Sequence, residues 1–249
     1  MNNNNLKKEV LIVGSNSALI RDSLNLFLKK GYNVVGISKR NKKLSFYKNK
    51  NYYHYNFDLI KNFNRIQGLC KKISNKLKNI SIIIYAQGGS LGINKIFTKF
   101  SNWQKLWKLN FACTLIFNNF FIKKFIKKKY GRILYFTSVA ANFKFGSPVY
   151  SSSKVCIQDY VKKMGNNFSN KNIFVNSINT SIVSDFGNNW NKFEIKSKKN
   201  RIIKLLSENL STQKFGRSSY FTEMIDLLCS KRNKFITGAN INMDGGFLR

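Results

Sequence analysis

Short apolar runs alternate along the chain with longer segments of helical periodicity, and this alternation limits the folds available to it. Runs of about four to eight residues rich in Val, Ile, Tyr and Phe predict strands, and the longer segments between them predict helices. The predicted strands cover residues 10–13, 33–38, 80–85, 132–137, 173–178 and 235–242. The predicted helices cover residues 18–30, 61–77, 101–128, 150–167 and 219–230.

Strands that are apolar throughout are typical of a parallel sheet covered by helices on both faces. Repeated strand–helix units therefore predict the α/β class, a doubly wound parallel sheet of the Rossmann type with ligands at the carboxyl ends of its strands. No internal repeat or linker-like composition interrupts residues 1–249, so a single domain is expected. The least regular stretch, 184–212, is predicted to be a flap over the substrate, with a solvated surface excursion as the alternative.

The composition is that of a globular protein. Of the 249 residues 43% are hydrophobic and 14% aromatic, which excludes a disordered polymer. No run approaches the roughly 18 apolar residues of a membrane span, and the first residues lack the pattern of a signal peptide, so no membrane partner is expected. Cys70, Cys113, Cys156 and Cys229 form no C-x-x-C pair, so neither a metal site nor a disulfide framework is indicated. A reduced, cytoplasmic protein is expected.

The net charge is strongly positive, because 44 Lys and Arg residues stand against 10 Asp and Glu residues and give a formal charge of +34. Such a charge raises nucleic acid as a partner. However, the lysines are spread over nearly every segment, and no recognition helix, zinc finger or RNA-binding aromatic motif accompanies them. We therefore expect no specific nucleic-acid partner. The charge is interpreted as a compositional bias, with attraction to an anionic substrate or acidic carrier as the alternative.

Tyr150 and Lys154 form the most informative local pattern. On a helix, residues four apart share one face, so the Lys154 ammonium is expected beside the Tyr150 phenol. A phenol with an ordinary pKa of about 10 is a poor acid or base at neutral pH, and a fixed neighbouring cation lowers that pKa. The hydroxyl of Ser138, at a predicted strand end, could hold a substrate carbonyl against the phenol. These residues predict a proton-transfer site, with a surface Tyr–Lys pair as the alternative.

The segment from Val13 to Ile20 follows the first predicted strand and opens a helix. A glycine turn at such a place exposes backbone N–H groups at a helix N-terminus, where a pyrophosphate can bind. Only one of the three glycines of this pattern is present, at Gly14, so the motif is weak by itself.

Taken in order, the motifs resemble those of the short-chain dehydrogenase/reductase family over essentially the whole chain. The layout is similar to that of 3-oxoacyl-(acyl carrier protein) reductases and of reductases in polysaccharide and flagellin-sugar biosynthesis. The residues that carry the resemblance are the turn 13–20, Phe57-Asp58-Leu59, Tyr85-Ala86-Gln87-Gly88, Asn110, Ser138, Tyr150 with Lys154, and the segments 175–179, 215–217 and 236–246.

Several positions depart from the family pattern. Ala18 and Ile20 replace two glycines of the turn, Tyr85 and Ala86 stand at two usual asparagines, and Thr180-Ser181 replaces Pro-Gly beside the nicotinamide. A glycine at the position of Ile20 allows close helix–strand packing, so the helix is expected to sit farther out. The departures bear on cofactor binding and leave the four catalytic positions intact. A non-catalytic nucleotide-binding or scaffold subunit is the alternative from another functional class.

The resemblance implies an oxidoreductase that transfers a hydride between NAD(P)H and a carbonyl/alcohol pair. It assigns the acid/base role to Tyr150 and the binding of ribose hydroxyls to Lys154. It also assigns the substrate carbonyl oxygen to Ser138 and a proton-relaying water to Asn110, which completes the expected catalytic set. Acid catalysis and oxyanion stabilisation then converge where negative charge develops.

The cofactor is expected to be NADP(H) rather than NAD(H). The end of the second predicted strand lacks the carboxylate that binds a free ribose 2′-hydroxyl, and Lys39 and Arg40 there can pair with a 2′-phosphate. The resemblance places Asp58 at the adenine, and His54, in the aromatic run 52–55, is interpreted as structural. The expected cofactor contacts are Gly14, Ser15, Ser17, Leu19, Lys39, Arg40, Asp58, Ala86, Gln87, Gly88, Tyr150, Lys154 and Val183.

Two substrate classes stay open. The C-terminal signature and a basic surface suit a small 3-oxoacyl group or one bound to an acidic carrier. The segment from Gln87 to Ile93, followed by Trp103 and Trp107, looks more like the sugar-type reductases, and this class is favoured. The resemblance also implies a homotetramer or dimer built through the long predicted helices and the C-terminal strand. The charge of +34 opposes such assembly at low salt.

Overall fold

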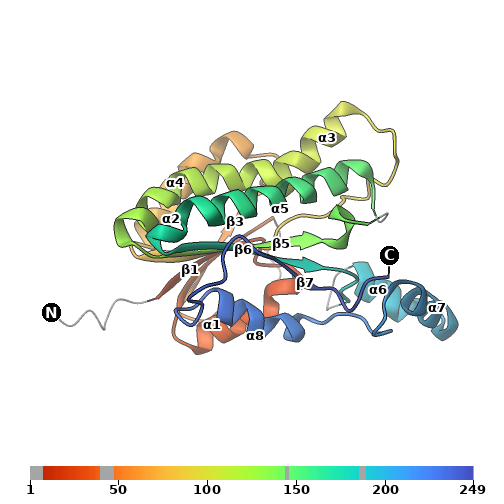
Figure 1. Cartoon of the computed structure of the whole chain (residues 1–249). Coiled ribbons are helices and arrows are strands. Elements are labelled where there is room, and N and C mark those ends of the chain that lie inside the picture. The colour runs from red at the N-terminus through yellow and green to blue at the C-terminus, as the bar shows by residue number, and fades with distance from the viewer. Residues whose placement is uncertain (1–7, 40–47, 144–145, 185–188, 249) are drawn as a thin grey trace.

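The computed structural model describes residues 8–39, 48–143, 146–184 and 189–248, and its strands form one parallel sheet (Figure 1). The strand order is β3-β2-β1-β4-β5-β6-β7, so the direction of winding reverses between β1 and β4. This arrangement confirms the predicted doubly wound α/β fold. The strands are β1 (Glu9–Val13), β2 (Asn33–Ser38), β3 (Tyr52–Asn56), β4 (Ile80–Tyr85), β5 (Gly131–Ser138), β6 (Ile173–Thr180) and β7 (Asn240–Met243).

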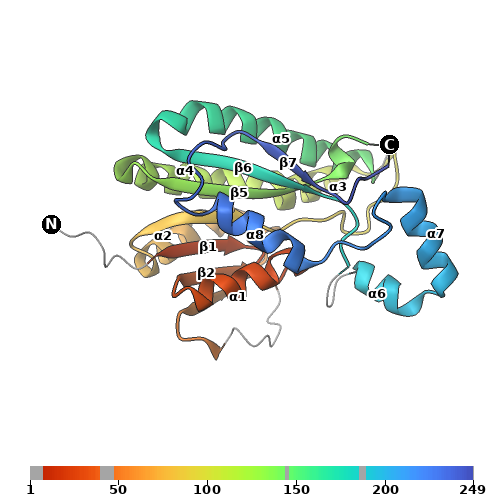
Figure 2. The same ribbon diagram turned by 60° about the horizontal axis from the view of Figure 1, so that its bottom comes forward.

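Helices cover both faces of the sheet, as Figures 1 and 2 show from two directions. Strand residues are buried on both sides: Leu11 and Val13 pack into one apolar layer, and Val10 and Ile12 into the other. No helix of the described residues is long and apolar enough to cross a membrane. The helices are α1 (Arg21–Lys29) and α8 (Ser218–Leu228) on one face, α2 (Ile66–Lys76), α3 (Phe100–Trp107), α4 (Cys113–Lys128) and α5 (Pro148–Phe168) on the other, and α6 (Asn189–Lys196) and α7 (Lys199–Asn209) beyond the strand ends.

Two predicted helices contain turns of different geometry. The helix predicted at 18–30 begins with a 3₁₀ turn, η1 (Ala18–Ile20), and the α-helix starts only at Arg21. Ile20 is fully buried between this helix and the sheet, where a glycine would leave the space empty. The helix predicted at 101–128 contains a π turn, η4 (Lys108–Ala112), between α3 and α4.

The strand predicted at 235–242 is wrong in its first half, because β7 begins only at Asn240. The Asn233 Oδ1 accepts hydrogen bonds from the backbone N–H groups of Phe235 at 3.3 Å and Ile236 at 2.9 Å. Gly238 follows with a φ of 70°, which no strand adopts. The Asn233 side chain thus binds backbone N–H groups that would otherwise donate to a neighbouring strand, and Phe235 is 95% exposed.

Candidate active site

The turns after β1 and β4 meet where the winding of the sheet reverses, which is the usual ligand site of such folds. Gly14 has a φ of 85°, and its N–H donates to the Ile37 carbonyl at 2.8 Å. A Cβ on Gly14 would lie 2.3 Å from the backbone nitrogen of Gln87. The single glycine kept from the family turn is therefore the one at which the two chain segments touch.

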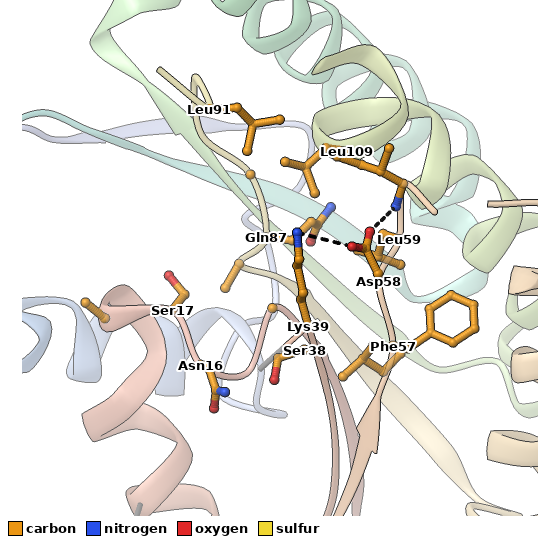
Figure 3. A pocket seen from close by; sticks show the side chains of 16 residues that line it. Asn16, Ser17, Ser38, Lys39, Phe57, Asp58, Leu59, Gln87, Leu91 and Leu109 are labelled. Atoms are coloured by element: carbon orange, nitrogen blue, oxygen red, sulfur yellow. Dashed lines mark hydrogen bonds and ion pairs between the residues drawn. The ribbon is translucent and has the colours of Figure 1, made fainter. Parts of the chain in front are cut away.

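A cavity of about 360 Å³ lies between these turns and the end of β2, and Figure 3 shows the side chains around it. Seven of the predicted cofactor contacts line it: Gly14, Ser17, Lys39, Asp58, Ala86, Gln87 and Gly88. Sequence reasoning missed the rest of the wall, which is mostly apolar and flanks those positions along the chain. These residues are Asn16, Ala18, Ile37, Ser38, Phe57, Leu59, Ile60, Leu91 and Leu109.

Asp58 lies in this cavity with its carboxylate already bound. It accepts a hydrogen bond from the N–H group of Ile60 at 2.9 Å, and the Lys39 Nζ lies 3.2 Å away (Figure 3). The N–H group of Lys61 donates to it as well, at 3.1 Å. Burial acts to raise the pKa of Asp58, but the two backbone donors and Lys39 outweigh it and hold the pKa below its usual value. The Lys39 side chain is 66% exposed, so this ion pair contributes at most about 1 kcal/mol.

Five predicted contacts do not line this cavity, and Arg40 lies outside the described residues; the five are Ser15, Leu19, Tyr150, Lys154 and Val183. The Ser15 hydroxyl is buried and accepts a hydrogen bond from the Tyr52 hydroxyl at 3.2 Å, away from the cavity walls. Leu19 and Val183 line a second cavity instead. His54 lies in the middle of β3, and its Nε2 is 2.8 Å from the Ser38 Oγ; burial lowers its pKa.

The second cavity, of about 420 Å³, shares Ser17 and Ala18 with the first and contains Ser138 and Tyr150. None of its described lining side chains carries a charge, although the chain has 44 cationic residues. The remaining lining residues are Leu19, Gly89, Ser90, Asn94, Gly146, Thr180, Ser181, Val183 and Trp190. Trp190 lies within 184–212, the stretch that the sequence predicts to be a flap over the substrate, but no local pattern singled out Trp190 itself.

Tyr150, Lys154 and Ser138 come together because α5 runs back along β5. The helix begins at Pro148, which suits a first helical position, and Tyr150 and Lys154 occupy its first turns. The Lys154 Nζ lies over the Tyr150 ring, 5.8 Å from its centroid, and donates to the Phe136 carbonyl at 2.9 Å. Ser138, at the end of β5, shares a hydrogen bond with the Tyr150 phenol.

The expected lowering of the Tyr150 pKa by Lys154 is not found in the structure. Burial raises the pKa of the phenol, and the hydrogen bond with Ser138 offsets this only in part. The Lys154 ammonium lies over the Tyr150 ring and donates to a carbonyl of β5. Burial also lowers the pKa of Lys154, to about 8.

Asn110 lies within the π turn that joins α3 and α4. Its Oδ1 accepts from the Gly89 N–H at 3.0 Å, and its Nδ2 donates to the carbonyls of Gly89 at 3.2 Å and Leu106 at 3.0 Å. A Cβ on Gly88 would lie 2.4 Å from the Asn110 Oδ1 and 3.3 Å from the Lys154 Nζ. Asn110 therefore fixes the chain after β4 beside Lys154, as π turns at functional sites often do.

These residues fit a dinucleotide cofactor. At Gly14 and Gly88 an added Cβ would clash with Gln87 and Asn110, so these glycines allow the close packing of the turns that form the wall of the first cavity. The Gln87 Nε2 contacts the Cys113 Sγ at 3.6 Å, whereas its buried Oε1 has no hydrogen-bond partner among the described residues. A buried acceptor without a donor in a cavity wall suits a hydroxyl-bearing ligand.

Comparison with known proteins agrees with this geometry. The family model for short chain dehydrogenases matches residues 8–194. A 3-oxoacyl-(acyl-carrier-protein) reductase FabG of Buchnera aphidicola subsp. Schizaphis graminum is 26% identical over 245 residues, which cover 96% of this chain and 97% of that protein.

Among solved structures, ElxO with NADP bound has a TM-score of 0.84 at 22% identity and covers 96% of this chain and 98% of its own. 4-Hydroxyisoleucine dehydrogenase complexed with NADH has a TM-score of 0.80 at 23% identity, with the same coverage. At these identities the likeness concerns the fold.

A doubly wound sheet with a cofactor-sized cavity at the reversal point and a Ser–Tyr–Lys cluster beside it defines a class of dinucleotide-dependent enzymes. With its family model matched over most of its length, the chain belongs to the short chain dehydrogenase family. It is an oxidoreductase that uses a nicotinamide cofactor and acts on a carbonyl or the corresponding alcohol.

Proposed function

We propose that the protein reduces a carbonyl group that has no charged group beside it to an alcohol, with Tyr150 as the proton donor. The observation that carries the proposal is that Ser138 and Tyr150 both line the uncharged cavity, with Lys154 buried behind them. The bound nicotinamide cofactor supplies the hydride. Gly14, Gln87 and Gly88 are the residues proposed to hold it in the neighbouring cavity.

The chain's own residues then manage the charge that develops on the substrate oxygen. The Ser138 hydroxyl donates a hydrogen bond to that oxygen, and the Tyr150 phenol transfers its proton to it. A raised pKa keeps Tyr150 protonated at neutral pH, as a proton donor must be. Lys154, whose ammonium is bound to the Phe136 carbonyl behind the ring, is proposed to bind the ribose hydroxyls of the cofactor, and Asn110 holds the Gly88–Gly89 backbone in place beside it.

We propose NADP(H) as the preferred cofactor. Lys39 stands at the rim of the first cavity, at the end of β2, where no acidic side chain follows the strand. Its weak ion pair with Asp58 leaves the ammonium able to turn toward a 2′-phosphate. Fluorescence titration with NADPH and NADH tests this preference, and Lys39→Gln should reduce the affinity for NADPH by about tenfold without changing that for NADH.

A 3-oxoacyl thioester is the substrate we propose, because the similar 3-oxoacyl reductases align with 96% of the chain. A keto-sugar nucleotide, the class favoured by the sequence, stays the second candidate. The hydroxyl groups of Ser90, Thr180 and Ser181 and the Asn94 amide in the cavity wall suit it. Both classes are uncharged at the reacting carbonyl, as the cavity requires. NADPH oxidation with acetoacetyl thioester or with a keto-sugar nucleotide distinguishes the two.

Substitution of Tyr150 by phenylalanine tests the proposed acid directly. Tyr150→Phe removes the transferable proton and keeps the ring, so turnover should fall by at least about 10³-fold while the Kd for NADPH changes less than about twofold. Retained turnover would exclude the acid role. Absence of NADP(H) binding by the unmodified protein would favour the non-catalytic alternative.

We further propose that the protein forms a homodimer or homotetramer. Ile96, Phe97 and Phe100 precede or begin α3 and are 69%, 90% and 74% exposed, which is unusual for large apolar side chains in a monomer. The cytoplasmic location expected from the cysteine pattern remains a prediction.

A further inference from the structure

Trp190 reaches the second cavity from a part of the chain that has its own small core. α6 and α7 pack around Leu206, Leu210 and Phe215, separately from the two large apolar layers of the sheet. Trp190 packs edge-on against Phe193 of the same helix, with ring centroids 5.9 Å apart. The position of the Trp190 ring in the cavity therefore depends on how this unit, residues 189–215, is attached to the sheet.

A charged cluster forms part of that attachment, together with Ile182 and Phe247 in the small core and the backbone hydrogen bonds from Ser211 to Gly246 and from Thr212 to Gly245. The Glu194 side chain, one helical turn after Trp190, accepts hydrogen bonds from the Arg217 Nη2 at 2.7 Å and Nη1 at 3.0 Å. Arg217 lies just before α8 and also donates to the Ser184 carbonyl at 2.9 Å. The Ser184 hydroxyl donates to the Glu194 Oε2. Glu194 thus joins α6 to two segments of the main body at once.

The two body segments are themselves held together. The Ser184 N–H donates to the Gly216 carbonyl at 3.1 Å, and the Gly216 N–H donates to the Ile182 carbonyl at 3.0 Å. Val183, between them, lines the second cavity. Ser184 and Arg217, which donate to Glu194, are consequently fixed relative to the sheet. The bidentate Arg217–Glu194 pair restricts the orientation of α6 as well as attracting it electrostatically.

Glu194 connects separate elements, whereas Glu208, the other described acidic residue of the unit, does not. Glu208 lies on α7 and pairs with Lys204 of the same helix at 3.8 Å, with 58% of its side chain exposed. Glu194 is 26% exposed and bridges separate elements. In a chain with 10 acidic residues against 44 basic ones, a carboxylate in a bridging pair is scarce.

We propose that Glu194 and Arg217 are positioning residues that fix α6, and that Trp190 is thereby held as a specificity-determining wall of the substrate cavity. The ring adds an apolar face to a cavity whose other walls are mostly small or hydroxyl-bearing residues. A substrate with an apolar face beside its carbonyl, either an acyl chain or the C–H face of a sugar ring, matches that wall. This inference rests on the proposed function, which assigns the second cavity to the substrate.

A double-mutant cycle on the full-length protein tests the proposal. Glu194→Gln keeps the side-chain shape and removes the charge, and it should raise KM for the ketone substrate about three- to tenfold with kcat less affected. Trp190→Leu should act in the same direction. The double variant should be no worse than Trp190→Leu alone, because both changes act through one ring. Glu208→Gln is the matched control and should leave KM unchanged.

Two further measurements make a contrary result informative. The Kd for NADPH should change less than about twofold in Glu194→Gln. The proposal would be overturned if NADPH affinity fell together with substrate affinity, or if KM were unchanged. It would also be overturned if the effects of Glu194→Gln and Trp190→Leu on KM added up in the double variant. If no substrate is turned over, the proposed function fails, and acrylamide quenching still tests the inference. With Trp103 and Trp107 replaced by Phe, Glu194→Gln should increase quenching of Trp190 about twofold, and equal quenching would refute the positioning role.

Discussion

Lys154 brings a positive charge into a site from which water is largely excluded. Its side chain is 4% exposed, and its ammonium donates to the Phe136 carbonyl. Burial lowers its pKa to about 8 from an ordinary value of 10.5. The buried cation is thus obtained at a cost to the stability of the folded protein.

The pKa shift of Lys154 predicts a pH-dependent gain in stability on its removal. Between about pH 8 and 10.5 the unfolded chain holds this proton and the folded protein releases it, so the penalty for the buried charge is complete below pH 8 and vanishes toward pH 10.5. Lys154→Met should therefore raise Tm by about 2–6 °C at pH 7, and the difference should disappear as the pH rises to 10.5. Thermal melts of both proteins over this range measure it, and a difference independent of pH would contradict the assigned cause.

Gly14 shows how much a single backbone position can determine. Gly14→Ala places a Cβ 2.3 Å from the Gln87 nitrogen at a φ of 85°, so it should destabilise the fold by about 2–4 kcal/mol and abolish NADPH binding. Gly31 is the matched control, since it has a φ of 75° with nothing within 4 Å of an added methyl group. Gly31→Ala should cost about 1 kcal/mol. Urea unfolding of the two variants compares them, and equal losses would refute the clash.

At the scale of elements, one amide holds α4 and α5 against the sheet. The Asn118 Oδ1 accepts from the Tyr85 hydroxyl of β4 at 2.8 Å, and its Nδ2 contacts the hydroxyls of Tyr135 on β5 at 2.7 Å and Tyr160 on α5 at 3.2 Å. Asn118, Tyr85 and Tyr135 are almost completely buried. Tyr85, which departs from the family pattern, is therefore part of a polar network that compensates its buried hydroxyl.

Removal of the Asn118 amide should lower the free energy of unfolding far more than removal of the Asn119 amide beside it. Asn118→Ala leaves buried hydroxyls without their partner and should lower the free energy of unfolding by about 2–4 kcal/mol. Asn119 is the next residue of α4 and is exposed, so Asn119→Ala should be neutral or slightly stabilising. Denaturant unfolding of both variants provides the comparison. A loss below about 1 kcal/mol in Asn118→Ala would show that the tyrosines find other partners.

For the whole molecule, the formal charge of +34 is the dominant long-range quantity. Charges on separate chains repel across any interface, and the Debye length falls from about 10 Å at 0.1 M to about 3 Å at 1 M salt. The second cavity contains none of this charge among its described lining residues. The excess positive charge therefore affects the association of chains and the rate of encounter with anionic partners rather than the reacting carbonyl.

Assembly should accordingly depend on ionic strength. If the exposed apolar residues before α3 form an interface, the fraction of dimer or tetramer should rise as NaCl is increased from about 20 to about 500 mM. Light scattering or sedimentation at one protein concentration measures the shift. Phe97→Ser should reduce the oligomer at high salt, and a monomer at every salt concentration would refute the proposed assembly.

Sequence patterns predicted the five inner strands of the sheet well, because strands buried on both faces have continuous apolar runs. The edge strand β3, which is only partly buried, was not among the predicted strands. The proximity of Tyr150 and Lys154 was predictable for a similar reason, because residues four apart on a helix share one face. Boundaries were less predictable. The Asn233 side chain delays β7, and the π turn at Asn110 interrupts a helix without any change of periodicity.

The chain alone determined the α/β class, the glycine turn at Gly14 and the identity of the expected catalytic set, since these follow from local periodicity and fixed spacings. Only the tertiary structure decided what surrounds that set. In the folded chain the Lys154 ammonium donates to the Phe136 carbonyl, and no described lining residue of the second cavity is charged. Trp190 lines that cavity on a helix that the Glu194–Arg217 ion pair joins to the main body. These outcomes depend on contacts between residues far apart in the chain, and no local pattern encodes the distances and burial that set their energies.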